Sequence, residues 1–146
     1  MAEAMLNHLA HGRFTAYSAG SNPEANQTPN PMAIDTLKKA GVSIEGLHSK
    51  AWDQFGHPDA PHMDLVITVC DDAAGEVCPI WPGHPATAHW GFHDPATIHG
   101  SDEEKMEAFR QTLHLIARRL DLLINLPFAS LNKLTLEQHL LDIANH

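Results

Sequence analysis

The amino-acid sequence predicts an α/β domain in which helices flank a parallel sheet. Its most apolar stretch, residues 64–70 (DLVITVC), is short and β-branched, which is typical of a parallel strand covered on both faces. Residues 101–127 instead place apolar side chains three and four positions apart, which is typical of an amphipathic helix. Because two strand patterns are interleaved with four helix patterns, a parallel sheet is the simplest topology.

The chain opens with a helix pattern. Apolar residues recur at helical spacing over residues 2–9, and Gly12 is suited to the left-handed position that often follows a helix. No strand, turn or capping residue precedes this helix, although the first amides of a helix normally need a cap. We therefore expect that the beginning of the domain is missing.

A strand and a second helix follow. Residues 14–19 are rich in strand formers and end at Gly20, so they predict a strand. Asn30 is a favoured N-cap and Pro31 a favoured first helical residue, so the sequence predicts a helix from there to Ala40.

Two capping patterns mark the C-terminal helices. Ser101 with Glu104 predicts the start of a long helix that runs toward Pro127, and Thr135 with Gln138 predicts the start of a short terminal helix. Between the central strand and these helices, residues 88–92 form a short segment that contains Trp90 and Phe92.

Length and composition fit a single domain spanning residues 1–146. The 16.0 kDa chain is 43% apolar and 18% charged, which argues against disorder and against a fibrous repeat. Its formal net charge of -9 argues against binding to nucleic acid or to an anionic membrane. The sequence has neither an apolar run long enough to cross a membrane nor a signal peptide, so we expect a cytoplasmic protein.

The two cysteines are candidates for thiol chemistry. Cys70 lies at the carboxyl end of the predicted central strand, an edge where α/β sheets bind ligands, and Cys78 follows in a Gly- and Pro-rich loop. A loop of this length lets two sulfurs meet, but a core cysteine beside an incidental one would give the same spacing. Nearby Asp71, Asp72 and Glu76 would raise a thiol pKa, whereas a helix N-terminus would lower it.

Other polar residues nearby allow further readings. His84, His89 and His93, together with the thiols, are ligand types for zinc, but the tight ligand pair of most zinc sites is absent from the sequence. Asp94 precedes Pro95, which fixes the backbone after a carboxylate, although an ordinary Asp-Pro turn has the same pattern.

The remaining aromatic and basic candidates fit structural roles. Trp81 and Trp90 are expected to pack the Pro-rich loop down. The pairs Lys38 with Lys39 and Arg118 with Arg119 are expected to be solvated charges on helices. The sequence contains no Gly-rich loop that runs into a helix and could bind an oxyanion.

Five stretches give the chain a specific resemblance. In order and spacing, MAEAMLNHLA, YSAGSNP, DLVITVCDDAAGEVCP and HWGFHDPA resemble the arsenate reductases of the low-molecular-weight tyrosine phosphatase superfamily. The stretch LINLPFASLNKLTLEQHLLDIA resembles a C-terminal helical extension, from about residue 128, of some bacterial members. The resemblance implies a three-layer parallel sheet flanked by helices, with the family's first strand and its Cys-containing oxyanion loop missing here.

The resemblance also implies site residues. A loop cysteine of the family attacks arsenate, the cysteine matching Cys70 displaces arsenite, and the one matching Cys78 completes a disulfide. Asp94 matches the general acid. The resemblance implies no bound cofactor. The implied partners are arsenate and an external thiol reductant, either thioredoxin or glutaredoxin with glutathione. The implied role is arsenic detoxification in bacteria.

Departures from the family pattern qualify this expectation. The thiols lie one residue further apart than in thioredoxin-linked members, which leaves the reductant open, and Ala96 replaces the tyrosine usual in phosphatases, which favours a reductase. Without the oxyanion loop we expect the 146-residue chain to be inactive alone. The alternatives are a phosphatase-like protein, or a non-catalytic thiol- or metal-binding remnant that self-associates through an open sheet edge.

Overall fold

A computed structural model describes residues 1–20, 29–48, 50–69 and 85–145 of the chain. Its sheet pairs β1 (Leu65–Thr68) with β2 (Ala86–His89) in parallel, with Leu65 opposite Ala86 and Thr68 opposite His89. The parallel pairing and the flanking helices confirm the predicted α/β class. The central strand lies where the β-branched run predicts it, and β2 begins two residues before the predicted segment.

The strand predicted over residues 14–19 is wrong. This segment has no regular secondary structure, and only Gly20 forms an isolated parallel bridge, with Ala51. The Asn7 side chain of α1 (Ala2–Ala10) accepts a hydrogen bond from the Ala16 amide at 2.9 Å and donates one to the Ala16 carbonyl at 3.2 Å. A side chain therefore takes up the backbone groups that a neighbouring strand would bind.

The four helices lie close to their predicted positions. Besides α1 they are α2 (Pro31–Lys39), α4 (Asp102–Ile124) and α5 (Lys133–Ile143). Asn30 and Ser101 accept hydrogen bonds from helix amides, as expected of N-caps. Short 3-10 helices η1 (Trp52–Phe55), η2 (Pro95–Thr97) and η3 (Phe128–Ser130) lie between these elements.

The predicted start of the last helix is wrong by one turn. Asn132, rather than Thr135, is the N-cap of α5, because its side-chain oxygen accepts hydrogen bonds from both the amide and the hydroxyl of Thr135. Thr135 therefore lies inside the helix. Asn is at least as good an N-cap as Thr, so the capping pattern alone favoured the wrong residue.

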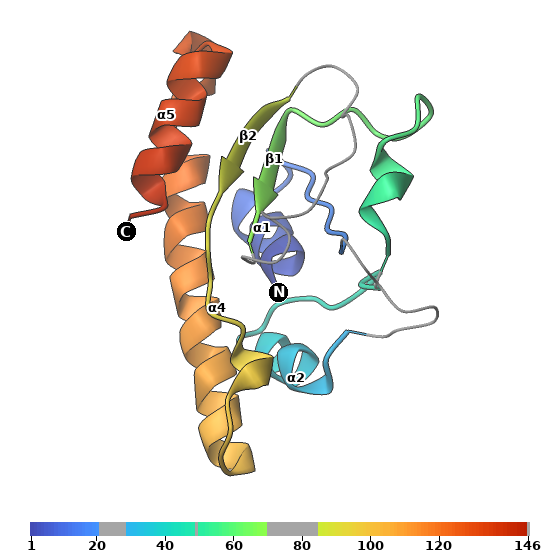
Figure 1. Ribbon diagram of the computed structural model, residues 1–146, viewed down its shortest axis with the longest axis vertical. Coiled ribbons are helices and arrows are strands. Elements are labelled where there is room, and N and C mark those ends of the chain that lie inside the picture. Colours follow the sequence, from blue (N-terminus) through green and yellow to red (C-terminus); the bar gives the residue numbers. More distant parts are fainter. Residues whose placement is uncertain (21–28, 49, 70–84, 146) are drawn as a thin grey trace.

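The helices and the sheet enclose one apolar core. In Figure 1 α5 runs beside β2, and α4 packs against α1, α2 and α5, with α2 nearer the N-terminal end of α4. The most deeply buried large side chains are Trp90, Leu37, Leu123 and Leu140. Trp90 donates its indole N–H to the Leu140 carbonyl at 2.9 Å, which attaches α5 to the chain just after β2. Trp90 is thus structural, as expected, but most of the Pro-rich loop that it was expected to pack down lies outside the described residues, as does Trp81.

One of the four basic residues does not fit the expectation. Lys38, Lys39 and Arg118 are exposed, as predicted, but Arg119 is buried, with 7% of its surface accessible. Arg119 lies three residues after Ile116 and four before Leu123, both of which are buried, so it shares their helix face.

Within the described residues, no helix is long and apolar enough to cross a membrane.

Replacing Leu140 by alanine tests whether α5 belongs to the core. Leu140 is fully buried, so Leu140→Ala should lower the free energy of unfolding by about 2–5 kcal/mol. The matched control is Leu141→Ala, because this neighbouring leucine is 56% exposed and should change stability little. Urea titration followed by circular dichroism measures both, and equal losses would contradict the described packing of α5.

Candidate functional site

The carboxyl ends of β1 and β2 form one edge of the molecule. Thr68 and His89 end the two strands opposite each other, and the Trp90 amide donates to the Thr68 carbonyl at 2.7 Å. The pairing continues beyond the strands, since the Phe92 amide donates to the Val69 carbonyl at 3.0 Å. The chain therefore leaves both strands at the same place, and this edge is the candidate active site.

The thiols themselves cannot be placed at this edge from the structure. Cys70 and Cys78 lie outside the described residues, so their approach stays a prediction. Cys70 is nevertheless joined by a single peptide bond to Val69, whose carbonyl accepts the Phe92 amide.

Asp94 lies on the same segment as Phe92. It is exposed, and its carboxylate caps η2 by accepting a hydrogen bond from the Ala96 amide at 2.9 Å. Its own carbonyl accepts the hydroxyl of Thr97 at 2.7 Å, and η2 packs against α4. These contacts hold the backbone of Asp94 in a defined turn that presents the carboxylate to solvent. The same contacts occur in ordinary Asp-Pro turns, so they allow an acid role without establishing one.

His89 and Thr68 form a polar pair between the strand ends. The Thr68 hydroxyl lies 2.7 Å from Nδ1 of His89, so the imidazole is held against the end of β1. His93 is exposed on the segment after β2, and His84 lies outside the described residues. Across the described ranges no group of three or more His, Cys, Asp or Glu could hold a metal ion. The hypothesis of a zinc site depends on Cys70 and Cys78, which lie outside the described residues, so it stays a prediction.

Arg119 brings a buried positive charge to this edge, a feature that sequence reasoning missed. Its guanidinium carbon lies 4.5 Å from the centre of the Phe92 ring, and Nη1 donates to the Gly91 carbonyl at 3.4 Å. Burial lowers the pKa of Arg119 from its ordinary value, but a guanidinium remains charged at neutral pH. The signal for its burial was its position on the apolar face of the long helix.

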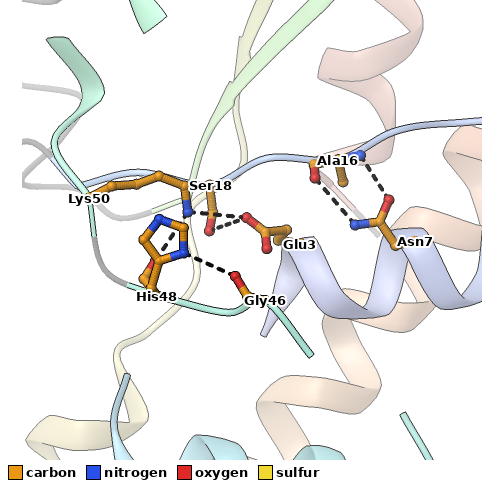
Figure 2. Close-up of polar contacts among 7 residues, drawn as sticks. All are labelled: Glu3, Asn7, Ala16, Ser18, Gly46, His48 and Lys50. Atoms are coloured by element: carbon orange, nitrogen blue, oxygen red, sulfur yellow. Dashed lines mark hydrogen bonds and ion pairs between the residues drawn. The ribbon is translucent and has the colours of Figure 1, made fainter. Parts of the chain in front are cut away.

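A second polar cluster, formed by Glu3, Ser18 and Lys50, joins three segments of the chain. Figure 2 shows the Lys50 ammonium and the Ser18 hydroxyl meeting the Glu3 carboxylate of α1, at 3.5 and 2.9 Å. Lys50 also donates to the His48 carbonyl at 3.1 Å. The side chains of Lys50 and Glu3 are only 7% and 12% exposed, so water screens their attraction weakly.

A cavity of about 790 Å³ separates β1 from α1, α4 and residues 13–17. Leu65, Ile67 and Val69 line it from β1 and the residue after it. Residues 13–17 and 61–64, together with α1 and α4, form much of the remaining wall, and Trp90, Phe92, Phe128 and Leu136 complete it. The expectation of an open sheet edge is compatible with this cavity, but self-association is untested.

The chain is similar to the members of a known protein family. The family model described as low molecular weight phosphotyrosine protein phosphatase matches residues 1–136. An arsenate reductase of Bacillus licheniformis is 39% identical over 121 residues, covering 82% of this chain and 81% of the relative. Arsenate reductases of Bacillus subtilis and Staphylococcus aureus are 38% and 30% identical, covering 82% and 84% of this chain and 81% and 86% of the relatives.

A solved structure has the same fold. It is described as an arsenate reductase in the reduced state, and it superposes with a TM-score of 0.57 at 23% identity, covering 84% of each chain. It agrees with the parallel architecture expected from the sequence.

A double-mutant cycle tests the contribution of the Glu3–Lys50 pair. Glu3→Gln, Lys50→Met and the double variant should give a coupling energy of about 0.5–3 kcal/mol in urea unfolding, because the pair is largely buried. The exposed Glu107–Arg110 pair of α4 is the matched control and should give a much smaller coupling. Equal coupling in the two pairs would show that burial does not strengthen the Glu3–Lys50 contact.

Proposed function

The chain belongs to the low molecular weight phosphotyrosine protein phosphatase family and, within it, to the arsenate reductases, and from this we propose that it reduces arsenate to arsenite through a relay of thiols. The observation that best supports the proposal is the hydrogen bond from the Phe92 amide to the Val69 carbonyl. It holds the segment that contains Asp94 against the residue that precedes Cys70. An acid and a thiol would therefore act at one edge of the sheet.

The relay requires three sulfurs and this sequence supplies two, so we expect the chain to be inactive until a first thiol is supplied from outside. We take the reaction to pass through an arsenic adduct of a first thiol. Cys70 attacks the sulfur of that adduct, the sulfur–arsenic bond breaks, and its electron pair reduces arsenic to arsenite. Cys78 then attacks the Cys70 sulfur, which forms the Cys70–Cys78 disulfide and releases the first thiol.

Asp94 is the proposed general acid. Formation of the first sulfur–arsenic bond expels an oxygen of arsenate, and a carboxylic acid that protonates this oxygen makes it leave as water. The turn after β2 holds Asp94 exposed, so its carboxyl group can reach a substrate that arrives from solvent. The structural alternative is that Asp94 only caps η2.

The oxidised pair must be reduced by a second protein or by a small thiol. Two electrons leave the cysteines in each cycle, so an external thiol reductant has to return them. We propose thioredoxin, or glutaredoxin with glutathione, as this partner, in the reducing environment of the cytoplasm.

Mild oxidation tests the thiol relay. We expect the purified chain to form an intramolecular Cys70–Cys78 disulfide, seen by peptide mapping as one linked fragment and by loss of both sites to alkylation. Cys70→Ser and Cys78→Ser should each leave one alkylatable thiol. Thioredoxin with its reductase and NADPH should reopen the bridge, and glutaredoxin with glutathione serves as the comparison. Two thiols that stay free or join separate chains would rule out the relay.

The arsenate step is tested by supplying the first thiol as glutathione. With arsenate and glutathione, the chain should release arsenite faster than the same mixture without protein, and Cys70→Ser should abolish the increase. The chain without any added thiol should release none, because two of the three sulfurs are present in its sequence. Equal arsenite release with and without the chain would contradict arsenate reduction.

A further inference from the structure

We propose that the cavity beside β1 is a docking groove for an extended apolar peptide, which joins the sheet as an added strand. The groove is lined by Leu65 and Ile67 of β1, by residues 13–17 and by parts of α1 and α4. Its occupant is a segment of another polypeptide, about four or five residues long, to match the four residues of β1. The proposal is independent of the thiol relay, because it uses the edge of β1 that faces away from β2.

The backbone of β1 is paired on one side only. The Trp90 amide donates to the Thr68 carbonyl, and the register of β1 against β2 places the ladder bonds on even-numbered residues of β1. Leu65 and Ile67 alternate with these residues, so their amides and carbonyls point to the opposite edge. Among the described residues, none is hydrogen-bonded to these groups. An edge of this kind is a template for a further strand.

The segment across the groove carries a second row of free backbone groups. In Figure 1 it runs uncoiled after α1, on the side of β1 away from β2. Asn7, which does not line the groove, is hydrogen-bonded to the amide and the carbonyl of Ala16, so those of Thr15 and Tyr17 are turned the other way. Within the described ranges these groups also have no hydrogen-bond partner. An extended peptide can bond to both rows, whereas a compact apolar ligand leaves them unpaired.

The helices determine which side chains the peptide must carry. Ile116, Leu120 and Leu123 of α4 line the groove and are buried, and Leu6 of α1 lines it as well. A strand in the groove turns alternate side chains toward these residues, so those side chains must be aliphatic.

The other edge of the sheet is already closed. Glu137 of α5 accepts hydrogen bonds from the amide and the hydroxyl of Thr87, both at 3.2 Å. Thr87 alternates with the β2 residues that bond to β1, so its amide is one that an edge strand would otherwise expose. A strand can therefore be added beside β1 but not beside β2.

A second copy of the chain fits the groove less well than a separate segment does. The β1 edge of that copy is enclosed by the same walls, so two such edges could meet only if residues 13–17 moved away in both molecules. An extended segment enters without this movement.

Binding of a synthetic peptide tests the proposal. The labelled probe has two lysines for solubility followed by Leu-Val-Ile-Thr-Val, the order of residues 65–69, which includes β1. Fluorescence anisotropy with the reduced full chain should show saturable one-to-one binding. The same peptide N-methylated at alternate residues keeps its side chains but loses donors along one edge, so it should bind about ten-fold more weakly. Absence of binding, or equal affinity of the two peptides, would overturn the proposal.

Amide hydrogen exchange followed by NMR locates the peptide. When about nine-tenths of the chain is bound, the Leu65 and Ile67 amides should exchange about ten-fold more slowly, because only the free fraction exchanges. The Thr87 amide is the internal control, since it is already bonded to Glu137. Slower exchange at Thr87 alone would refute the location. A peptide-free chain that sediments as a dimer with these two β1 amides already protected would assign the groove to a second copy and refute the proposal.

A pair of leucine variants tests the groove from the protein side. Leu65→Asp places a charge in the groove and should abolish binding, whereas Leu141→Asp changes a leucine that is 56% exposed and does not line the groove, so it should bind as the parent does. If circular dichroism shows that Leu65→Asp does not fold, the N-methylated peptide decides, because it leaves the protein unchanged. Equal binding by the two folded variants would contradict the proposal.

Discussion

The parallel register of β1 against β2 is the constraint on which the candidate site depends. It places Thr68 and His89 opposite each other, and the pairing continues through Val69 and Phe92. Both chain segments therefore leave the sheet at one edge, one toward Cys70 and the other toward Asp94. A shift of register by a single residue would turn the side chains of a strand to the opposite face and separate these groups.

The helices hold this edge in place from the side of the core. Trp90 is buried immediately after β2 and is hydrogen-bonded to α5, while η2, which begins just after Asp94, packs against α4. Arg119 extends from α4 to Gly91 and Phe92 between these two contacts. The segment that contains the proposed acid is therefore fixed by the same helices that form the core, so its position is coupled to the stability of the domain.

Sequence patterns predicted those elements whose signals are local. The β-branched run at 64–70 and the caps Asn30 and Ser101 correspond to real elements because burial and capping act within a few residues. The strand predicted at 14–19 does not form, because the Ala16 backbone is hydrogen-bonded to the side chain of Asn7. Strand propensity does not reveal such a partner. Arg119 is buried although its residue type predicts exposure, because its position lies on the apolar face of α4. The resemblance predicted Asp94 and the thiols, but only the position of Asp94 is described by the structure.

Nuclear Overhauser contacts in the reduced protein test the central claim most directly, namely that the thiol, the acid and the cation share one edge of the sheet. With Cys70 isotopically labelled, we predict contacts from its amide and β protons to the ring protons of Phe92. The reason is that the Phe92 amide is hydrogen-bonded to the carbonyl of Val69, the residue before Cys70, and the Phe92 ring is stacked on Arg119. Contacts from Cys70 only to its own sequence neighbours, with none to residues 91–94, would contradict it.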